Sequence, residues 1–177
     1  MRKLLIVLAV ICLVPLSFVL AVLVHHNVVD TSDYNYNHFA ASQYHHGTFS
    51  GPQVGEPAID FALYDTDGNR HALSDYRGQY VVIETGSLTC PQYISRIEPM
   101  TSLQAAHPEV TFLTLYVREA HPGSKIARHE RYEDKTALAS RVQLEEPETR
   151  TILVDELAGP VHQSYGAWPN MVYIIDP

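Results

Sequence analysis

Short apolar runs alternate with segments of helical periodicity along the second part of the chain, and this order most constrains the fold. Four runs have the length and composition of buried strands: 80–83, 110–117, 151–154 and 171–175. Helical or broken helical segments lie between them, over 91–103, 135–144 and 155–166. Strands that alternate with helices form parallel βαβ units. The sequence therefore predicts an α/β fold.

A β-hairpin is expected in front of these units. Residues 57–64 alternate apolar and polar side chains, as in a strand with one buried face, and 71–73 can return beside them. The turn between the two contains Gly68, which tolerates the positive φ of tight turns. The folded domain is therefore expected to begin near Val54 and to occupy residues 54–177.

The N-terminal residues favour a membrane anchor. Residues 4–24 carry no charge, and a helix of that length, at about 1.5 Å per residue, spans a hydrocarbon core. A cleaved signal peptide is the alternative, but its apolar stretch usually has only about 7–15 residues. Arg2 and Lys3 precede the run, whereas 25–53 contains neither Lys nor Arg. The positive-inside rule therefore predicts a single-pass membrane protein with residues 1–3 cytoplasmic and the domain extracytoplasmic.

Residues 25–53 are predicted to be a polar linker. They are rich in His, Tyr and Asn, and no apolar period could build a packed face there. A metal site formed by the histidines at 25, 26, 38, 45 and 46 is the alternative. No carboxylate or Cys lies at a spacing that would complete such a site, so we expect a linker and no metal.

Charge and cysteine content argue against three classes of protein. With 12 Lys and Arg against 20 Asp and Glu, the net charge is −8, which argues against a nucleic-acid partner because phosphates must be neutralised. Cys12 and Cys90 are the only cysteines, too few for a disulfide scaffold or a four-Cys zinc module. A small molecule is the expected partner.

Cys90 is the candidate nucleophile. It lies between the strand 80–83 and a helix that starts at Pro91. Free backbone N–H groups and the positive end of the helix dipole meet at such a junction and favour the reactive thiolate. Thr89 is expected to donate its hydroxyl hydrogen to the same sulfur. A structural core Cys is the alternative, but Cys90 follows a turn rather than an apolar stripe.

Other candidate residues follow neighbouring strands. Glu119 and His121 come directly after the strand 110–117, and ligand crevices of open α/β sheets lie at the carboxyl ends of the strands. A carboxylate and an imidazole beside a thiol are suited to proton transfer. His129 is a weaker candidate on the same loop. Trp168-Pro169, just before the last strand, is expected to contain a cis-proline that presents backbone beside the thiol.

The motifs resemble those of a known family. GEPAIDFAL (55–63) and LSDYRG (73–78) look like the start of peroxiredoxin- and TlpA-type redoxin domains. GSLTCPQY (86–93) resembles the active-site segment of the iodothyronine deiodinases, in which selenocysteine follows Ser-x-Thr and precedes Pro-Pro-Phe. YVREAH (116–121) is similar to the Tyr-Ile-x-Glu-Ala-His stretch of that family, and 154–173 resembles its final segment.

The resemblance implies a thioredoxin-like three-layer sandwich with an N-terminal hairpin, after one transmembrane helix. Its catalytic residues would be Cys90, in the selenocysteine position, with Thr89, Glu119, His121 and His129. The candidate substrate-binding residues are Pro91, Tyr93, Trp168 and Pro169. This sequence departs from the pattern by having Cys in place of selenocysteine and Asn170-Met171 in place of Glu-Arg. It also ends at Pro177, before the last strand and helix of the family's fold.

The expected function is thiol-dependent reductive dehalogenation, or a related reduction, by a membrane-anchored single-Cys enzyme. No second Cys lies within reach, so an external thiol or thiol reductase must regenerate the sulfur, and no bound cofactor is expected. A one-Cys peroxidase is one alternative, and a non-enzymatic redoxin-fold binding module is another. A homodimer is one option for the assembly.

Overall fold

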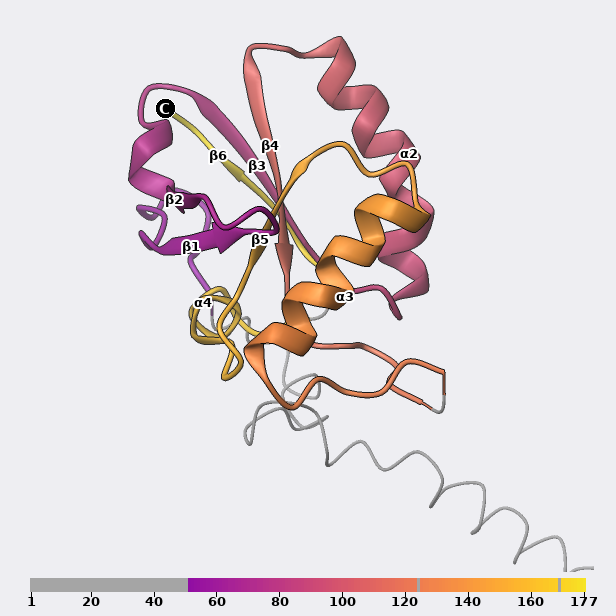
Figure 1. Cartoon of the computed structure of the whole chain (residues 1–177). Coiled ribbons are helices and arrows are strands. Elements are labelled where there is room, and N and C mark those ends of the chain that lie inside the picture. Colours follow the sequence, from indigo (N-terminus) through magenta and orange to yellow (C-terminus); the bar gives the residue numbers. More distant parts are fainter. Residues whose placement is uncertain (1–50, 124, 169) are drawn as a thin grey trace, which may run out of the picture. The chain divides into compact units, whose positions relative to one another are not determined.

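A computed structural model of the chain describes residues 51–177 except 124 and 169. Within this part, six strands form one sheet in the order β2-β1-β5-β4-β3-β6 (Figure 1). The strands are β1 (Ala62–Asp65), β2 (Arg70–Ala72), β3 (Tyr80–Gly86), β4 (Val110–Tyr116), β5 (Thr151–Val154) and β6 (Val172–Ile175). The helices are the 3₁₀ helix η3 (Leu73–Tyr76) and the α-helices α2 (Pro91–Ala106), α3 (Tyr132–Glu145) and α4 (Pro160–Ser164).

The centre of the sheet is parallel, as the alternation of strands and helices predicts. β3 pairs with β4 over its whole length, and β4 pairs with β5. Helix α2 connects β3 to β4, and α3 connects β4 to β5. The carboxyl ends of the three parallel strands therefore meet at one edge of the sheet, the lower edge in Figure 1.

The outer strand β6 differs from the predicted parallel arrangement, because it runs antiparallel to β3. The reason lies in the connection. A parallel strand requires a crossover that returns to the opposite edge of the sheet, whereas α4 has only five residues and spans about 7.5 Å. The chain enters β6 from the edge at which β5 ends. The sheet is consequently mixed, with the hairpin β1–β2 and β6 flanking a parallel centre.

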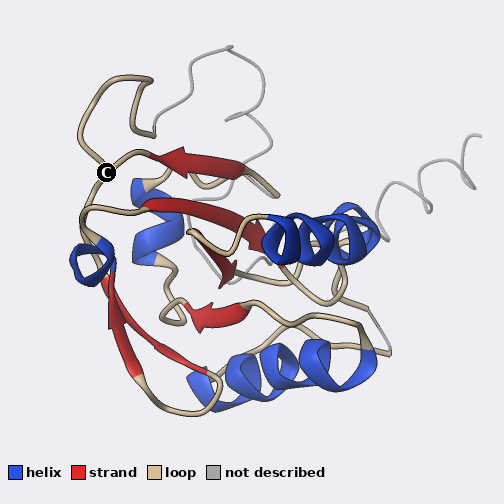
Figure 2. Ribbon diagram, turned by 90° about the horizontal axis from the view of Figure 1, so that it is seen from above, coloured by secondary structure: helices blue, strands red, loops and turns tan. Residues whose placement is uncertain are grey.

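Both faces of the sheet are covered, which makes three layers (Figure 2). On one face, the strands pack against α2 and α3 through Tyr93, Ile97, Ala139 and Val142. On the other face, alternate residues of the same strands pack with residues from η3 and α4: Leu73, Val161 and Tyr165. Strand residues point to the two faces in turn, so β4 and β5 contribute to both cores.

Two predicted boundaries were wrong. The first strand begins at Ala62 rather than at Pro57, because Asp60 Oδ1 accepts the backbone N–H groups of Phe61 and Ser74 in place of a ladder partner. Helix α3 begins at Tyr132, three residues before Lys135. Asp134 accepts the N–H of Arg131 at 3.2 Å, and such a contact satisfies one of the free donors at a helix start.

The predicted anchor, residues 4–24, and all but the end of the predicted linker, 25–53, lie outside the described residues. In the part that is described, none of the helices has the length and apolar character needed to cross a bilayer.

Candidate active site

Cys90 occupies the junction between β3 and α2, as its position in the sequence predicts. It is the N-cap residue of α2, and Pro91 takes the first helical position. A backbone N–H at that position would have no partner within the helix, so proline is tolerated there. The N–H of Cys90 donates to the Ser87 carbonyl at 3.0 Å. Cys90 is a free cysteine and only 6% exposed, so it is buried. The positive end of the α2 dipole lies at the sulfur and stabilises negative charge that develops there.

Glu119 connects the turn that carries Cys90 to the end of β4. Its carboxylate is 1% exposed and accepts three hydrogen bonds. Oε2 accepts the Thr89 N–H at 2.9 Å and the Thr89 hydroxyl at 2.6 Å, and Oε1 accepts the Tyr116 hydroxyl. Tyr116 Oη in turn accepts the Leu88 N–H at 3.1 Å. We call Thr89, Tyr116 and Glu119 the carboxylate cluster.

Burial and the neighbouring carboxylate act together on Tyr116. Burial raises the pKa of its hydroxyl, and the charge of Glu119 raises it further. Tyr116 therefore stays protonated and can only donate toward Glu119. The hydrogen bonds of the carboxylate cluster consequently run in one direction, toward the carboxylate beside the Cys90 turn.

The hydroxyl of Thr89 makes a different hydrogen bond from the predicted one to the Cys90 sulfur. A hydroxyl has one hydrogen, and here it is donated to Glu119 Oε2. The same oxygen accepts the backbone N–H of His121 at 3.0 Å, and Ser87 Oγ accepts the N–H of Ala120 at 3.1 Å. These contacts hold the 119–121 segment against the Cys90 turn. The expected meeting of the two segments at one sheet edge is thus observed, with the His121 side chain exposed.

Tyr93 was predicted to bind substrate, but the structure places its side chain in the interior. Its side chain is 0% exposed, and its hydroxyl donates to Glu148 Oε2 at 2.9 Å. The ring packs against the backbone of Gly86, where an added Cβ would lie only 2.3 Å from a ring carbon. The periodicity of α2 places Tyr93 on the same face as Ile97 and Met100, so it anchors the helix rather than facing a ligand.

A buried network of charged side chains contacts Tyr93. Arg150 donates through Nη1 to Glu84 at 2.7 Å and through Nε and Nη2 to the Glu148 carboxylate at 2.8 and 2.5 Å. The guanidinium carbon lies 5.9 Å from the centre of the Tyr93 ring. Asn170 donates to Glu84 Oε1 at 3.3 Å. The network connects β3, the residues just before β5 and the segment before β6 to helix α2.

His129 lies in the interior, on the loop before α3. Its side chain is 2% exposed, and neither ring nitrogen has a hydrogen-bond partner among the described residues. Burial, followed by the charge of Lys135, lowers the pKa of His129 to about 3. The ring is neutral at physiological pH. His129 therefore offers an acceptor nitrogen inside the protein, and no contact joins it to Glu119 directly.

Two of the remaining predicted residues are at least partly accessible to solvent. Pro91 is exposed at the start of α2, and Trp168 is half-buried. The Trp168 carbonyl accepts a hydrogen bond from His162 Nε2 at 2.8 Å. Pro169 and its predicted cis bond lie outside the described residues. Among residues 51–177 other than 124 and 169, no three His, Cys, Asp or Glu side chains gather as a metal site requires.

Sequence reasoning missed three residues of this region. Tyr116 lies three positions before Glu119 in the YVREAH segment, but residues at that spacing on a strand and its following loop have no fixed contact. Ser87 was part of the Cys90 turn without an assigned role. Lys135 carried a visible clue, because it lies four residues before Ala139 and seven before Val142, on the buried stripe of α3.

The chain is similar to known proteins in sequence and in fold. A family model described as iodothyronine deiodinase matches residues 8–177. Thyroxine 5-deiodinase from Sus scrofa is 30% identical over 140 residues, which cover 72% of this chain and 46% of the relative. The type I iodothyronine deiodinase from Xenopus laevis is 28% identical over 133 residues, covering 69% and 52%. The chain spans about half the length of these curated relatives.

Solved structures show the same fold. A putative thiol:disulfide interchange protein DsbE from Chlorobium tepidum superimposes with a TM-score of 0.57 and 21% identity, covering 70% of this chain and 78% of that one. A putative thiol-disulfide oxidoreductase from Bacteroides vulgatus gives a TM-score of 0.54 and 20% identity, with coverages of 69% and 77%. The thioredoxin-like fold predicted from the sequence is thus confirmed.

Proposed function

Since the chain belongs to the iodothyronine deiodinase family, we propose that it catalyses thiol-dependent reductive deiodination of an aromatic substrate through Cys90. One observation carries the proposal. Cys90 lies at the N-terminus of α2, beside a carboxylate that accepts three hydrogen bonds from the surrounding turn and strand. The arrangement combines a nucleophile with a proton-handling group.

The proposed reaction begins with attack of the Cys90 thiolate on iodine. The C–I bond breaks, its electron pair remains on the aromatic carbon, and that carbon takes up a proton, while an S–I bond forms on Cys90. An external thiol then displaces iodide and forms a mixed disulfide, and a second thiol releases the oxidised disulfide and free Cys90. One aryl iodide and two thiols thus give the deiodinated arene, iodide, a proton and one disulfide.

The exposed imidazole of His121 is proposed to deliver the proton. Its backbone is held to Thr89 Oγ1, so the ring extends from the rim of the Cys90 turn. General acid–base groups typically contribute about 10²–10⁴-fold to a rate. We therefore expect His121→Ala to lower kcat/KM by roughly 10²-fold or more, with a smaller loss for His129→Ala, because His129 lies inside the protein.

The test uses the full chain in a nonionic detergent with excess dithiothreitol. An aryl iodide, hydrogen peroxide and a small disulfide are offered in parallel, and iodide release or thiol consumption is followed. Deiodination that disappears in Cys90→Ser but persists in the matched Cys12→Ser variant is the expected result. Full activity of Cys90→Ser, or turnover without thiol, would contradict the proposed mechanism. Reduction of peroxide alone would instead support a one-Cys peroxidase, and no turnover with any substrate would support a binding module.

The membrane attachment is part of the same proposal. Residues 4–24 anchor the protein with its N-terminus in the cytoplasm and the domain outside, because basic residues flank only the N-terminal side of the apolar run. Before protease is added, the domain should be recovered in the membrane fraction of spheroplasts. Protease added outside the spheroplasts should then digest it. A domain protected from the protease would refute the orientation, and a domain free in the medium would show that the segment is a cleaved signal.

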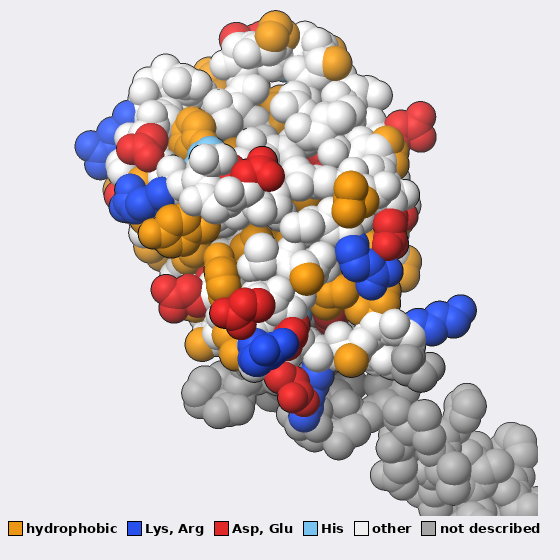
Figure 3. All heavy atoms as spheres, viewed as in Figure 1, with side chains coloured by type: hydrophobic (Ala, Val, Ile, Leu, Met, Phe, Trp, Pro, Cys, Tyr) orange, Lys and Arg blue, Asp and Glu red, His pale blue; other side chains and the backbone are white. Residues whose placement is uncertain are grey.

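The surface is consistent with a small-molecule substrate rather than a nucleic acid. On the face drawn in Figure 3, acidic and basic side chains of the described residues are interspersed and do not gather into a basic patch. A chain with a net charge of −8 also lacks the excess positive charge that phosphate binding requires. We propose an external thiol or thiol reductase as electron donor and a monomer or homodimer as the active form.

A further inference from the structure

Lys135 is a fully buried cation that the proposed mechanism does not use. Its side chain is 0% exposed, which is rare for Lys unless its charge is compensated. It also lies in the first turn of α3, the positive end of the helix dipole, where a cation is disfavoured. An apolar side chain at this buried position of α3 would cost less free energy, since a buried charge must be removed from water. Packing alone therefore does not explain a lysine here.

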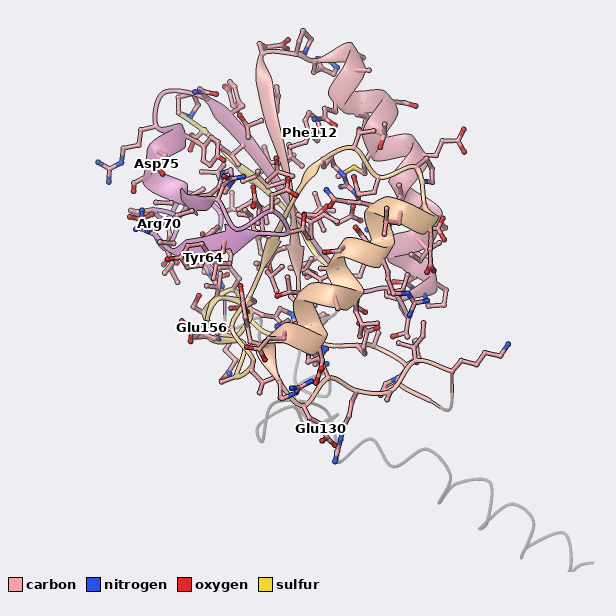
Figure 4. All side chains as sticks on the ribbon, in the orientation of Figure 1. Tyr64, Arg70, Asp75, Phe112, Glu130 and Glu156 are labelled. Carbon is pink, nitrogen blue, oxygen red and sulfur yellow. The ribbon has the colours of Figure 1, made fainter. Side chains whose placement is uncertain are left out.

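The surroundings of Lys135 supply compensating charges. The chain order β4-α3-β5 brings the start of α3 to the edge where β4 and β5 end. Lys135 Nζ donates to the Glu156 carbonyl at 3.0 Å. Its ammonium is stabilised by the carboxylates of Asp155, Glu119 and Glu156. Figure 4 shows Glu156 on the loop that leaves β5, at the end of the domain where α3 begins.

Asp155 is the second buried carboxyl group of this edge. It is fully buried and accepts the N–H groups of Val161 and His162 at 3.3 and 2.8 Å, which fixes it to the start of α4. This edge of the sheet therefore holds one buried carboxyl group that is fixed by α4 and another, Glu119, that belongs to the carboxylate cluster beside Cys90. Both raise the pKa of Lys135 against the effect of burial.

The imidazoles near Lys135 are uncharged. The pKa of His129 and of His162 is lowered to about 3, mainly by burial, and the charge of Lys135 contributes in the same direction. The buried Arg118 also acts on His162. Neither imidazole is protonated near neutral pH. If Lys135 lost its charge, the imidazoles would therefore not replace the positive charge near Glu119 and Asp155.

We propose that Lys135 is a positioning residue for the Cys90 reaction, acting through Glu119. Its ammonium balances the Glu119 and Asp155 carboxylates and so keeps the carboxylate cluster in the geometry that the reaction uses. The inference rests on the proposed function for the choice of assay. It adds a residue that touches neither substrate nor Cys90.

The charge of Lys135 is titratable in an accessible range. Burial lowers the pKa of Lys135 to about 8, against the opposing effect of the three carboxylates. A role that depends on the ammonium therefore fades as the pH rises through that value. Arginine in the same place would keep its charge throughout, and methionine, an unbranched side chain without charge, would lack it at every pH.

The test compares four full-length proteins in detergent: wild type, Lys135→Arg, Lys135→Met and Lys125→Met. Lys125 is exposed on the loop before α3, so its substitution removes the same charge without a buried partner. Deiodination with saturating thiol is measured from pH 6.5 to 9.5, and circular dichroism confirms that each variant is folded. We expect Lys135→Met to lose at least 10-fold in kcat/KM at pH 7. Lys135→Arg should stay within about 3-fold of wild type there.

The alkaline side of the profile is the readout that a purely structural role would not change. Activity of the wild type and of Lys125→Met should fall above about pH 8, whereas Lys135→Arg should remain active to a higher pH. An unchanged alkaline limb in Lys135→Arg, or wild-type kcat/KM at pH 7 in Lys135→Met, would overturn the inference. If Lys135→Met does not fold, the profile of Lys135→Arg decides alone.

Absence of deiodination by the wild type would count against the proposed function only. The inference is then tested by alkylation of Cys90 with iodoacetamide at pH 7, in a Cys12→Ser background. Extra negative charge behind Glu119 disfavours the thiolate, so Lys135→Met should react several-fold more slowly than wild type and Lys125→Met equally fast. Equal rates for all three proteins would overturn the inference.

Discussion

The two buried imidazoles, His129 and His162, make stability depend strongly on pH below neutrality. Both have a pKa of about 3 in the folded protein, with burial as the main cause, against about 6.5 in an unfolded chain. Their contribution to stability is fully present above pH 6.5. It is lost as the pH falls from 6.5 toward 3, because the unfolded chain then binds more protons than the folded one.

The size of the effect follows from the two pKa values. Each imidazole changes the free energy of unfolding by about 1.4 kcal/mol for each pH unit in this window. Between pH 7 and pH 5 the loss is about 2 kcal/mol for each residue and about 4 kcal/mol for both. Burial raises the pKa of Asp155, which acts in the opposite direction, so about 4 kcal/mol is an upper value. Net stabilities are usually about 5–15 kcal/mol, so such a loss is large.

Guanidinium titrations of the full chain in nonionic detergent, at pH 7, 6 and 5, measure this loss through the fluorescence of Trp168, the single tryptophan. His162→Gln and His129→Leu should each remove about half of the pH dependence, and the double variant should be nearly flat from pH 7 to 5. His107→Gln is the matched control, since that imidazole is 54% exposed. A double variant that still loses as much stability as the wild type would refute the reasoning.

Three substitutions of buried residues that support the start of α2 test the packing there, each by guanidinium titration at pH 7. Gly86→Ala should lower the free energy of unfolding by about 1–3 kcal/mol or more, because the new Cβ meets the Tyr93 ring; wild-type stability would show that the ring can move freely. Tyr93→Phe should lose about 1–3 kcal/mol because the buried Glu148 carboxylate loses one of its donors, and no loss would mean that water replaces the hydroxyl. Arg150→Met should lose about 3–5 kcal/mol because two buried carboxylates lose their counter-charge. The exposed Arg131→Met is the control, and an equal loss there would contradict the explanation.

The order of strands and helices, and with it much of the site, was readable from the sequence. Buried strands and amphipathic helices have different apolar periods, so the parallel centre of the sheet could be predicted. Cys90 and Glu119 follow two of these strands, and adjacent parallel strands end at the same edge. Their proximity therefore followed from local patterns and one topological rule.

Only the tertiary structure decided which groups these residues contact. Thr89 Oγ1 donates to a carboxylate 30 positions away, and Lys135 contacts a carbonyl 21 positions away. Apolar periodicity indicates that a position is buried. A hydrogen bond between distant segments depends instead on the register of the strands and on where each helix packs against the sheet. Tyr93, predicted to bind substrate, lies instead on the buried face of α2 with Ile97 and Met100, a placement that the motif alone did not indicate.

The sequence by itself determined the position of Cys90 between a strand and a helix, because backbone preferences and the spacing of apolar residues depend on a few neighbouring residues. The antiparallel course of β6, the hydrogen bonds of Glu119 and the charges around Lys135 depended on packing. A buried polar group must find its partner wherever the fold places one, and that place is set by the whole chain rather than by its neighbours in sequence.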